Sequence, residues 1–151
     1  LKDLAEFKQN TIAPVAGSEA LGTSLWYRDA LSLGAIDYMH YDLGWIGGIT
    51  EAIKISGIAH ANNRMMCPHD CTGPVVWIAN LHISLAYPNV IILESVRSYY
   101  DGFYKILVDN LPEVQNGFAL PMNGIGLGVD LNSSLLDSQD TSKKITTSKD
   151  I

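Results

Sequence analysis

Apolar segments alternate with helical patterns along the first hundred residues. A short apolar run over residues 12–16 predicts a strand, and apolar positions at helical spacing over residues 24–33 predict a helix that ends at Gly34. The same pair recurs along the chain: strand 36–41 and helix 50–61, strand 64–67 and helix 73–86, then strand 89–93. Residues 1–10 read as the end of a preceding helix. The pattern therefore predicts a series of strand–helix units.

Strands that alternate with helices through short loops favour parallel pairing with right-handed crossovers. Two folds fit that pattern, a doubly wound sheet and a (β/α)8 barrel. Polar residues favour the barrel, because ionisable side chains directly follow four successive expected strands, at Glu19, Asp42, His69 and Glu94. That is the face on which such barrels build their active sites. We therefore expect an α/β fold, the C-terminal half of a (β/α)8 barrel with four βα units.

Composition narrows the class of protein. Hydrophobic residues make up 47% of the 151 residues and charged residues 17%, which is typical of one globular unit, and no apolar run approaches the ~18 residues that span a bilayer. The net charge of −6 disfavours nucleic acid and anionic membranes as partners. The first residues lack the features of a signal peptide, and two cysteines are too few for a disulfide framework. We expect a cytoplasmic protein with a small-molecule ligand.

Both cysteines fall in one stretch, Cys67-Pro68-His69-Asp70-Cys71. A structural zinc site takes four ligands, commonly as two closely spaced pairs, and this stretch lacks the second pair. A zinc clip is therefore not favoured. Cys67 is expected to be an inward-facing filler at a strand end, and Cys71 to open the next loop. His69 is the residue of the stretch to which we assign chemistry.

Several motifs together resemble one family. The segments PVAGSE, YDLGWIGGITEA, CPHDCTGPV, VIILES and NGIGLGVDL, within residues 1–131, resemble the C-terminal barrel half of the enolase superfamily. The resemblance is to its mandelate racemase-like subgroup, especially acid-sugar dehydratases of the galactonate dehydratase kind. It implies a magnesium ion held by carboxylates that end the third, fourth and fifth strands. Glu19 matches the third of these ligands.

The resemblance also implies roles for the other three residues. Asp42 and His69 match an acid/base dyad in which Asp42 orients the imidazole and raises its basicity. Glu94 matches a group that hydrogen-bonds the substrate carboxylate as charge develops. The implied reaction removes the proton α to the carboxylate of a hydroxy acid and expels the β-hydroxyl as water, which gives a 2-keto-3-deoxy acid. His69 acts as the base or as the acid, depending on the stereochemistry of the substrate.

Other readings stay open. A racemase or epimerase would use the same residues, and a non-catalytic interaction module is the rival from another class. A half barrel exposes two strand edges, which predicts a homo-oligomer or pairing with a complementary half barrel. Taken singly, Glu19 fits a helix cap and Asp42 fits a turn. Packing, capping or the helix dipole explains the remaining histidines, His40, His60 and His82.

The chain also departs from a complete family member. The N-terminal capping domain and the first four barrel strands, with two metal ligands, have no counterpart in these 151 residues. After Asn132 the sequence becomes SSLLDSQDTSKKITTSKDI, which is poor in apolar residues. We expect residues 132–151 to form a flexible tail that follows the barrel domain of residues 1–131.

Overall fold

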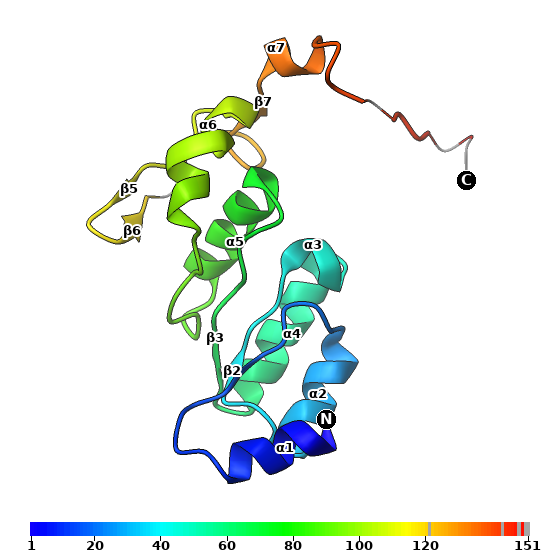
Figure 1. Cartoon of the computed structure of the whole chain (residues 1–151), viewed down its shortest axis with the longest axis vertical. Helices are drawn as coiled ribbons and strands as arrows, with labels where there is room; N and C mark the ends of the chain where they lie inside the picture. The colour runs from blue at the N-terminus through cyan, green and yellow to red at the C-terminus, as the bar shows by residue number, and fades with distance from the viewer. Residues whose placement is uncertain (121, 143, 148, 150–151) are drawn as a thin grey trace.

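The structure is a computed structural model that describes residues 1–120, 122–142, 144–147 and 149. Three two-residue strands, β1 (Ala16–Gly17), β2 (Tyr38–Met39) and β3 (Met65–Met66), form a parallel sheet in that order. Helices α2 (Ser24–Ser32) and α4 (Ile49–Ala61) connect them, and α5 (Pro74–Ala86) follows β3. Figure 1 shows the strands side by side with α2 and α4 on one side of them. The α/β fold with parallel strand–helix units is the expected one.

The fourth expected strand is much shorter than predicted. Residues 89–93 contribute one parallel bridge, between Val90 and Met66, rather than a strand. Backbone bonds still join this segment to β3, because Met66 N–H donates to Asn89 O (2.8 Å) and Ile91 N–H donates to Met66 O (3.1 Å). The other strands are also shorter than their apolar runs. Pro14 and Pro68 flank two of them, and proline supplies no N–H to the ladder.

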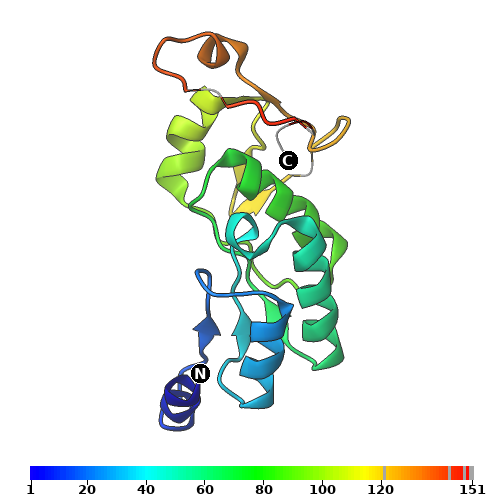
Figure 2. The ribbon, with the colours of Figure 1, turned by 90° about the vertical axis from the view of Figure 1, so that its right-hand side faces the viewer.

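Several elements lie outside the predicted pattern. A short helix α3 (Leu43–Ile46), which precedes α4, is one of them. In contrast, α1 (Lys2–Gln9), which precedes β1, agrees with the helix expected over residues 1–10. The C-terminal region contains the π-helical turn η1 (Tyr99–Phe103), the helices α6 (Tyr104–Leu107) and α7 (Ser133–Leu136), and two antiparallel pairs, β4 (Val108–Asp109) with β7 (Asp130–Leu131) and β5 (Val114–Gln115) with β6 (Phe118–Ala119). Figure 2 shows these elements at the end of the molecule opposite α1.

The segment predicted as a flexible tail begins with a short helix. Residues 133–136, expected to lie in the flexible segment, form α7. Asn132 caps this helix, because its side-chain oxygen accepts from Ser134 N–H at 3.0 Å. The backbone of Asn132 also donates to Leu107 O at 3.0 Å, which ties the start of the segment to α6. These bonds join residue 132 to its neighbours, and the division of the chain at residue 131 stays a prediction.

The main core lies between the sheet and its helices. α2 packs against α4, and α4 packs against α5. Met39 and Met66 are fully buried in this core, together with Val15, whereas Ile92 is 62% exposed. The half-barrel prediction places Val15, Met39 and Ile92 on the open inner face, where they would drive self-association. The structure contradicts this placement for Val15 and Met39, because alternate side chains on a strand point to opposite faces and these two are buried in the core shared with α2 and α4.

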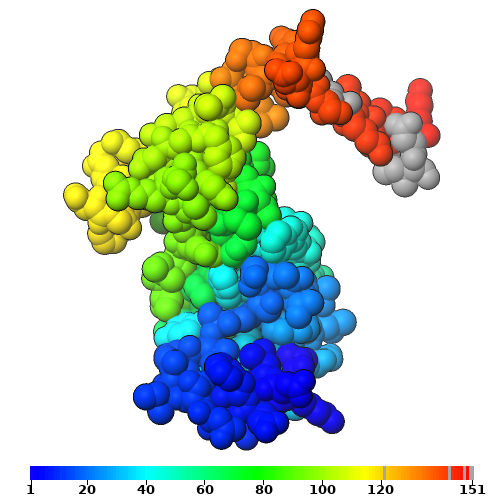
Figure 3. All heavy atoms as spheres, in the orientation of Figure 1, coloured from blue at the N-terminus to red at the C-terminus, as the bar shows by residue number. Residues whose placement is uncertain are grey.

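A second core holds the C-terminal region. Trp77 and Ile78 on α5 pack with Tyr104 and Val108, all at most 2% exposed. α5 is therefore buried on two sides, which explains why it is apolar nearly all round. Figure 3 shows the two regions in space-filling form, with the blue-to-green strand–helix units at one end. Among the described residues, no helix is both long and apolar enough to cross a membrane.

The open sheet edges predict self-association. In the described chain β1 pairs with β2 on one side only, and Ile91 and Ile92 beside β3 are 54% and 62% exposed. Burying one such side chain contributes about 1.5–3 kcal/mol. We expect oligomers at micromolar concentration in sedimentation velocity, and Ile92→Lys to weaken association about tenfold or more. Ile53→Lys on the outer face of α4 is the control. A compact stable monomer of the unsubstituted chain would contradict this expectation.

Candidate active site

The strand ends carry the candidate residues to one edge of the sheet. Backbone hydrogen bonds continue the ladder past the strands, from His40 N–H to Gly17 O (3.2 Å), from His69 N–H to Tyr41 O (2.8 Å) and from Glu94 N–H to Pro68 O (3.0 Å). These bonds fix the start of each loop relative to its neighbour. The structure thus brings Asp42, His69 and Glu94 together, with Glu19 reaching the same edge through His40.

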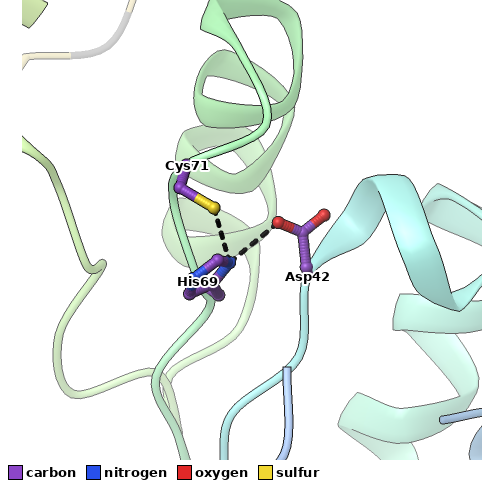
Figure 4. A group of neighbouring side chains, drawn as sticks. All are labelled: Asp42, His69 and Cys71. Atoms are coloured by element: carbon purple, nitrogen blue, oxygen red, sulfur yellow. Dashed lines mark hydrogen bonds and ion pairs between the residues drawn. The ribbon is translucent and has the colours of Figure 1, made fainter. Parts of the chain in front are cut away.

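Asp42 and His69 form the tightest pair of the site. The distance from His69 Nδ1 to Asp42 Oδ2 is 2.8 Å, as Figure 4 shows. Asp42 is fully buried, and its carboxylate also accepts from Gly44 N–H at 2.7 Å and from the Thr72 hydroxyl at 3.1–3.2 Å. A carboxylate accepts only, so Nδ1 carries the proton that joins the pair. His69 Nε2 is then left with its lone pair for proton transfer.

Local sequence explains why Asp42 stays in place. It caps α3, and a side chain at Gly44 would place a Cβ only 3.1 Å from Asp42 Oδ1. A glycine therefore allows the helix start to approach the carboxylate closely. Two further contacts hold His69: the Asn80 side chain donates to its backbone carbonyl at 3.0 Å, and the centroid of the Trp45 ring lies 5.6 Å from that of the imidazole.

His40 belongs to the site, although its sequence position led us to assign it to packing. Its Nε2 lies 2.9 Å from Glu94 Oε2, and its Nδ1 lies 3.7 Å from Glu19 Oε2. The His40 and His69 rings meet edge to face at 5.3 Å, and His69 Nε2 is 3.8 Å from Glu94 Oε2. The alternation of side chains along a strand could have indicated His40, because His40 lies two residues before Asp42 and therefore on the same side of the chain.

Asp70 anchors the loop that carries Glu94. This fully buried carboxylate accepts from the Tyr104 hydroxyl at 2.8 Å and from Val96 N–H at 3.0 Å, while the Trp77 indole donates to Ser95 Oγ at 2.7 Å. Burial raises the pKa of Asp70 and that of Tyr104. Nothing in the sequence distinguishes Asp70, because its partners lie 26 and 34 residues further along the chain.

The two thiols are unpaired and weakly nucleophilic. Burial raises the pKa of half-buried Cys67 to about 11, and desolvation together with nearby carboxylates raises the pKa of exposed Cys71. The other two histidines have structural positions. His82 Nε2 donates to Leu127 O at 3.1 Å, and His60 lies in the last turn of α4. Neither of them reaches the strand-end site.

Comparison with known proteins identifies the family to which this chain belongs. The family described as "Enolase C-terminal domain-like" matches residues 1–135, and the chain belongs to it. The D-galactonate dehydratase of Ralstonia nicotianae is 31% identical over 137 residues, which are 87% of this chain and 36% of that protein. The chain thus spans about a third of the length of that relative.

Solved structures agree with the family. A mandelate racemase subgroup enolase from Agrobacterium tumefaciens is 41% identical with a TM-score of 0.80, over 87% of this chain and 35% of that one. A putative mandelate racemase/muconate lactonizing enzyme from Burkholderia is 26% identical with a TM-score of 0.86, over 95% of this chain and 36% of that one. The chain therefore corresponds to part of the barrel of a mandelate racemase-like member of the enolase superfamily.

The Asp70 anchor gives a stability prediction. Tyr104→Phe removes the hydroxyl that pairs with buried Asp70 Oδ1, and an unpaired buried acceptor costs about 1–3 kcal/mol. We expect that loss in the free energy of unfolding, measured by urea denaturation. Tyr99→Phe is the matched control, since Tyr99 packs on the same ring cluster and shows ring contacts there. Equal stability of Tyr104→Phe and the unsubstituted chain would show that the Asp70 bond contributes nothing.

Proposed function

We propose that this chain supplies the acid/base part of a magnesium-dependent acid-sugar dehydratase, a lyase. The observation that supports the proposal most directly is the 2.8 Å pair of His69 and buried Asp42, with Glu94 beside it at the strand ends. The similarity to a D-galactonate dehydratase favours this chemistry over others of the superfamily. A small hydroxy-acid substrate in a reducing cytoplasm, where two thiols stay unpaired, fits the same proposal.

In this proposal His69 moves the proton. Its Nε2 takes the proton from the carbon α to the substrate carboxylate, or gives one to the β-hydroxyl, which leaves as water. Asp42 accepts from Nδ1–H, holds that tautomer and stabilises the positive charge that develops on the ring. Because the backbone and Thr72 fix Asp42, the imidazole needs little reorganisation during the reaction.

Glu94 and His40 act together on the substrate carboxylate. An ionised carboxylate only accepts, so Glu94 can donate a hydrogen bond to the substrate carboxylate only in its protonated form. His40 Nε2, at 2.9 Å from Glu94 Oε2, holds the carboxyl group in place. We therefore assign Glu94 to hydrogen-bonding the substrate and His40 to positioning Glu94.

Glu19 fits a magnesium ligand. The Glu19 side chain is 41% exposed. The distance from Glu19 Oε2 to His40 Nδ1 is 3.7 Å, which is longer than a hydrogen bond. An oxygen atom is therefore available, of the hard type that magnesium prefers. Magnesium, when bound, would stabilise the negative charge of the enediolate. One carboxylate leaves most of the roughly six coordination positions to water, substrate and carboxylates outside this chain.

A racemase or epimerase remains the second candidate. The structural relatives include putative mandelate racemase/muconate lactonizing enzymes, a description that does not specify a dehydratase. Product analysis separates the two activities, because a dehydratase releases a 2-keto-3-deoxy acid and a racemase or epimerase keeps every hydroxyl. The dyad serves both reactions.

The dyad is tested by paired substitutions in the complete enzyme, assayed on an acid sugar that it turns over. We expect His69→Asn to abolish turnover. Asp42→Asn should slow the reaction strongly, by up to about 10⁴-fold, the size of the effect when the aspartate of a serine protease triad is changed. The double mutant should be no slower than His69→Asn, because both changes remove one function.

His60→Asn serves as the control for loss of a histidine, since it lies at the end of α4. Folding of each variant is checked by circular dichroism and thermal unfolding. Near-normal turnover in His69→Asn, or fully additive losses in the double mutant, would refute the assignment of His69 as the acid/base group.

A further inference from the structure

Cys71 lies against the dyad and has no role in the proposed reaction. Its Sγ is 3.9 Å from His69 Nδ1, the same nitrogen that Asp42 Oδ2 approaches to 2.8 Å. One donor atom from each of the three residues lies within 4.8 Å of the others. Figure 4 shows the thiol and the carboxylate reaching one edge of the imidazole from separate strand ends. A thiol, an imidazole and a carboxylate thus converge.

These three groups are a ligand set of zinc type. Zn²⁺ binds sulfur at about 2.3 Å and nitrogen or oxygen at about 2.0–2.2 Å, so tetrahedral ligand atoms lie about 3.3–3.6 Å apart. The two distances at Nδ1, 2.8 and 3.9 Å, fall on either side of that range. Side-chain shifts of about half an ångström would bring these two distances into the range, and Cys71 Sγ lies within 4.8 Å of the Asp42 carboxylate. The sequence argument against zinc rested on a missing second pair of ligands, and the fold supplies one further ligand, Asp42.

The surroundings also favour a cation of this kind. Asp42 is oriented by hydrogen bonds from Gly44 N–H and the Thr72 hydroxyl, as carboxylates that bind a metal ion commonly are. Four carboxylates, those of Asp42, Asp70, Glu94 and Glu19, lie close enough to Cys71 to act on it electrostatically. A divalent cation is attracted to this concentration of negative charge, and it neutralises the thiolate and the carboxylate together.

We propose that a borderline or soft divalent ion such as Zn²⁺ binds to Asp42, His69 Nδ1 and Cys71, with water as the fourth ligand. Binding forms the metal–sulfur bond and releases the thiol proton to solvent, while the imidazole proton moves from Nδ1 to Nε2. The site is distinct from the magnesium position at Glu19, because magnesium prefers oxygen and rarely takes thiolate. A consequence, which rests on the proposed function, is that Zn²⁺ inhibits the enzyme by occupying the dyad.

Cobalt spectroscopy tests the site in the chain itself. Co²⁺ takes the place of Zn²⁺ in such sites, and a Co²⁺–thiolate bond gives a near-ultraviolet charge-transfer band. We expect titration of the reduced chain with Co²⁺ to produce this band, Zn²⁺ to displace it and excess Mg²⁺ to leave it unchanged. Cys71→Ser should abolish the band. Cys67→Ser should keep it, because Cys67 is outside the ligand group.

Four results of this experiment would contradict the proposed site. Absence of the band in the unsubstituted chain, its survival in Cys71→Ser, its loss in Cys67→Ser, or its removal by Mg²⁺ would each overturn the proposal. Cys71 is exposed, so its replacement by serine should leave the fold intact, which circular dichroism checks. The test detects a metal–thiolate bond and does not depend on enzymatic turnover of a substrate. It therefore succeeds or fails independently of the dehydratase assignment.

Discussion

The hydrogen bond between His69 Nδ1 and Asp42 Oδ2 is the interaction on which the site depends. A fully buried carboxylate is costly unless its oxygens are satisfied, and here Gly44 N–H, Thr72 and the imidazole satisfy them. The same bonds remove the freedom of Asp42 to rotate. The imidazole is consequently oriented with Nε2 3.8 Å from Glu94 Oε2, the oxygen that His40 Nε2 approaches to 2.9 Å.

Buried contacts elsewhere in the structure hold the loops that carry this hydrogen bond. Parallel strands of two residues each give few ladder bonds, so the loops after them need additional anchors. The Tyr27 hydroxyl provides one, at 3.0 Å from Ser18 O and 2.8 Å from His40 O, and burial raises its pKa. Asp70 provides another, through Tyr104 and the backbone of Val96. Precision at the strand ends therefore comes from buried polar groups as much as from the sheet.

Much of this could be read from sequence. The apolar patterns predicted α2, α4 and α5 to within one residue at each end, because apolar residues at helical spacing mark α2 and α4, and a Gly-Pro start before a long apolar run marks α5. Glu19, Asp42, His69 and Glu94 were expected at one edge, since parallel strands end together. The sequence did not reveal the roles of His40, Trp45 and Asp70. Their contacts depend on the side of the backbone from which each side chain projects, and on partners that lie far along the chain. Strand lengths and the small antiparallel pairs are also set by tertiary contacts.

The tautomer of His69 tests the account most directly. Long-range proton–nitrogen NMR correlation on the histidine-labelled chain distinguishes a protonated from an unprotonated ring nitrogen, and loss of signals in His69→Asn assigns them. If Asp42 accepts from Nδ1, the neutral His69 ring must carry its proton on Nδ1 and a lone pair on Nε2. A neutral ring protonated on Nε2 would contradict the dyad.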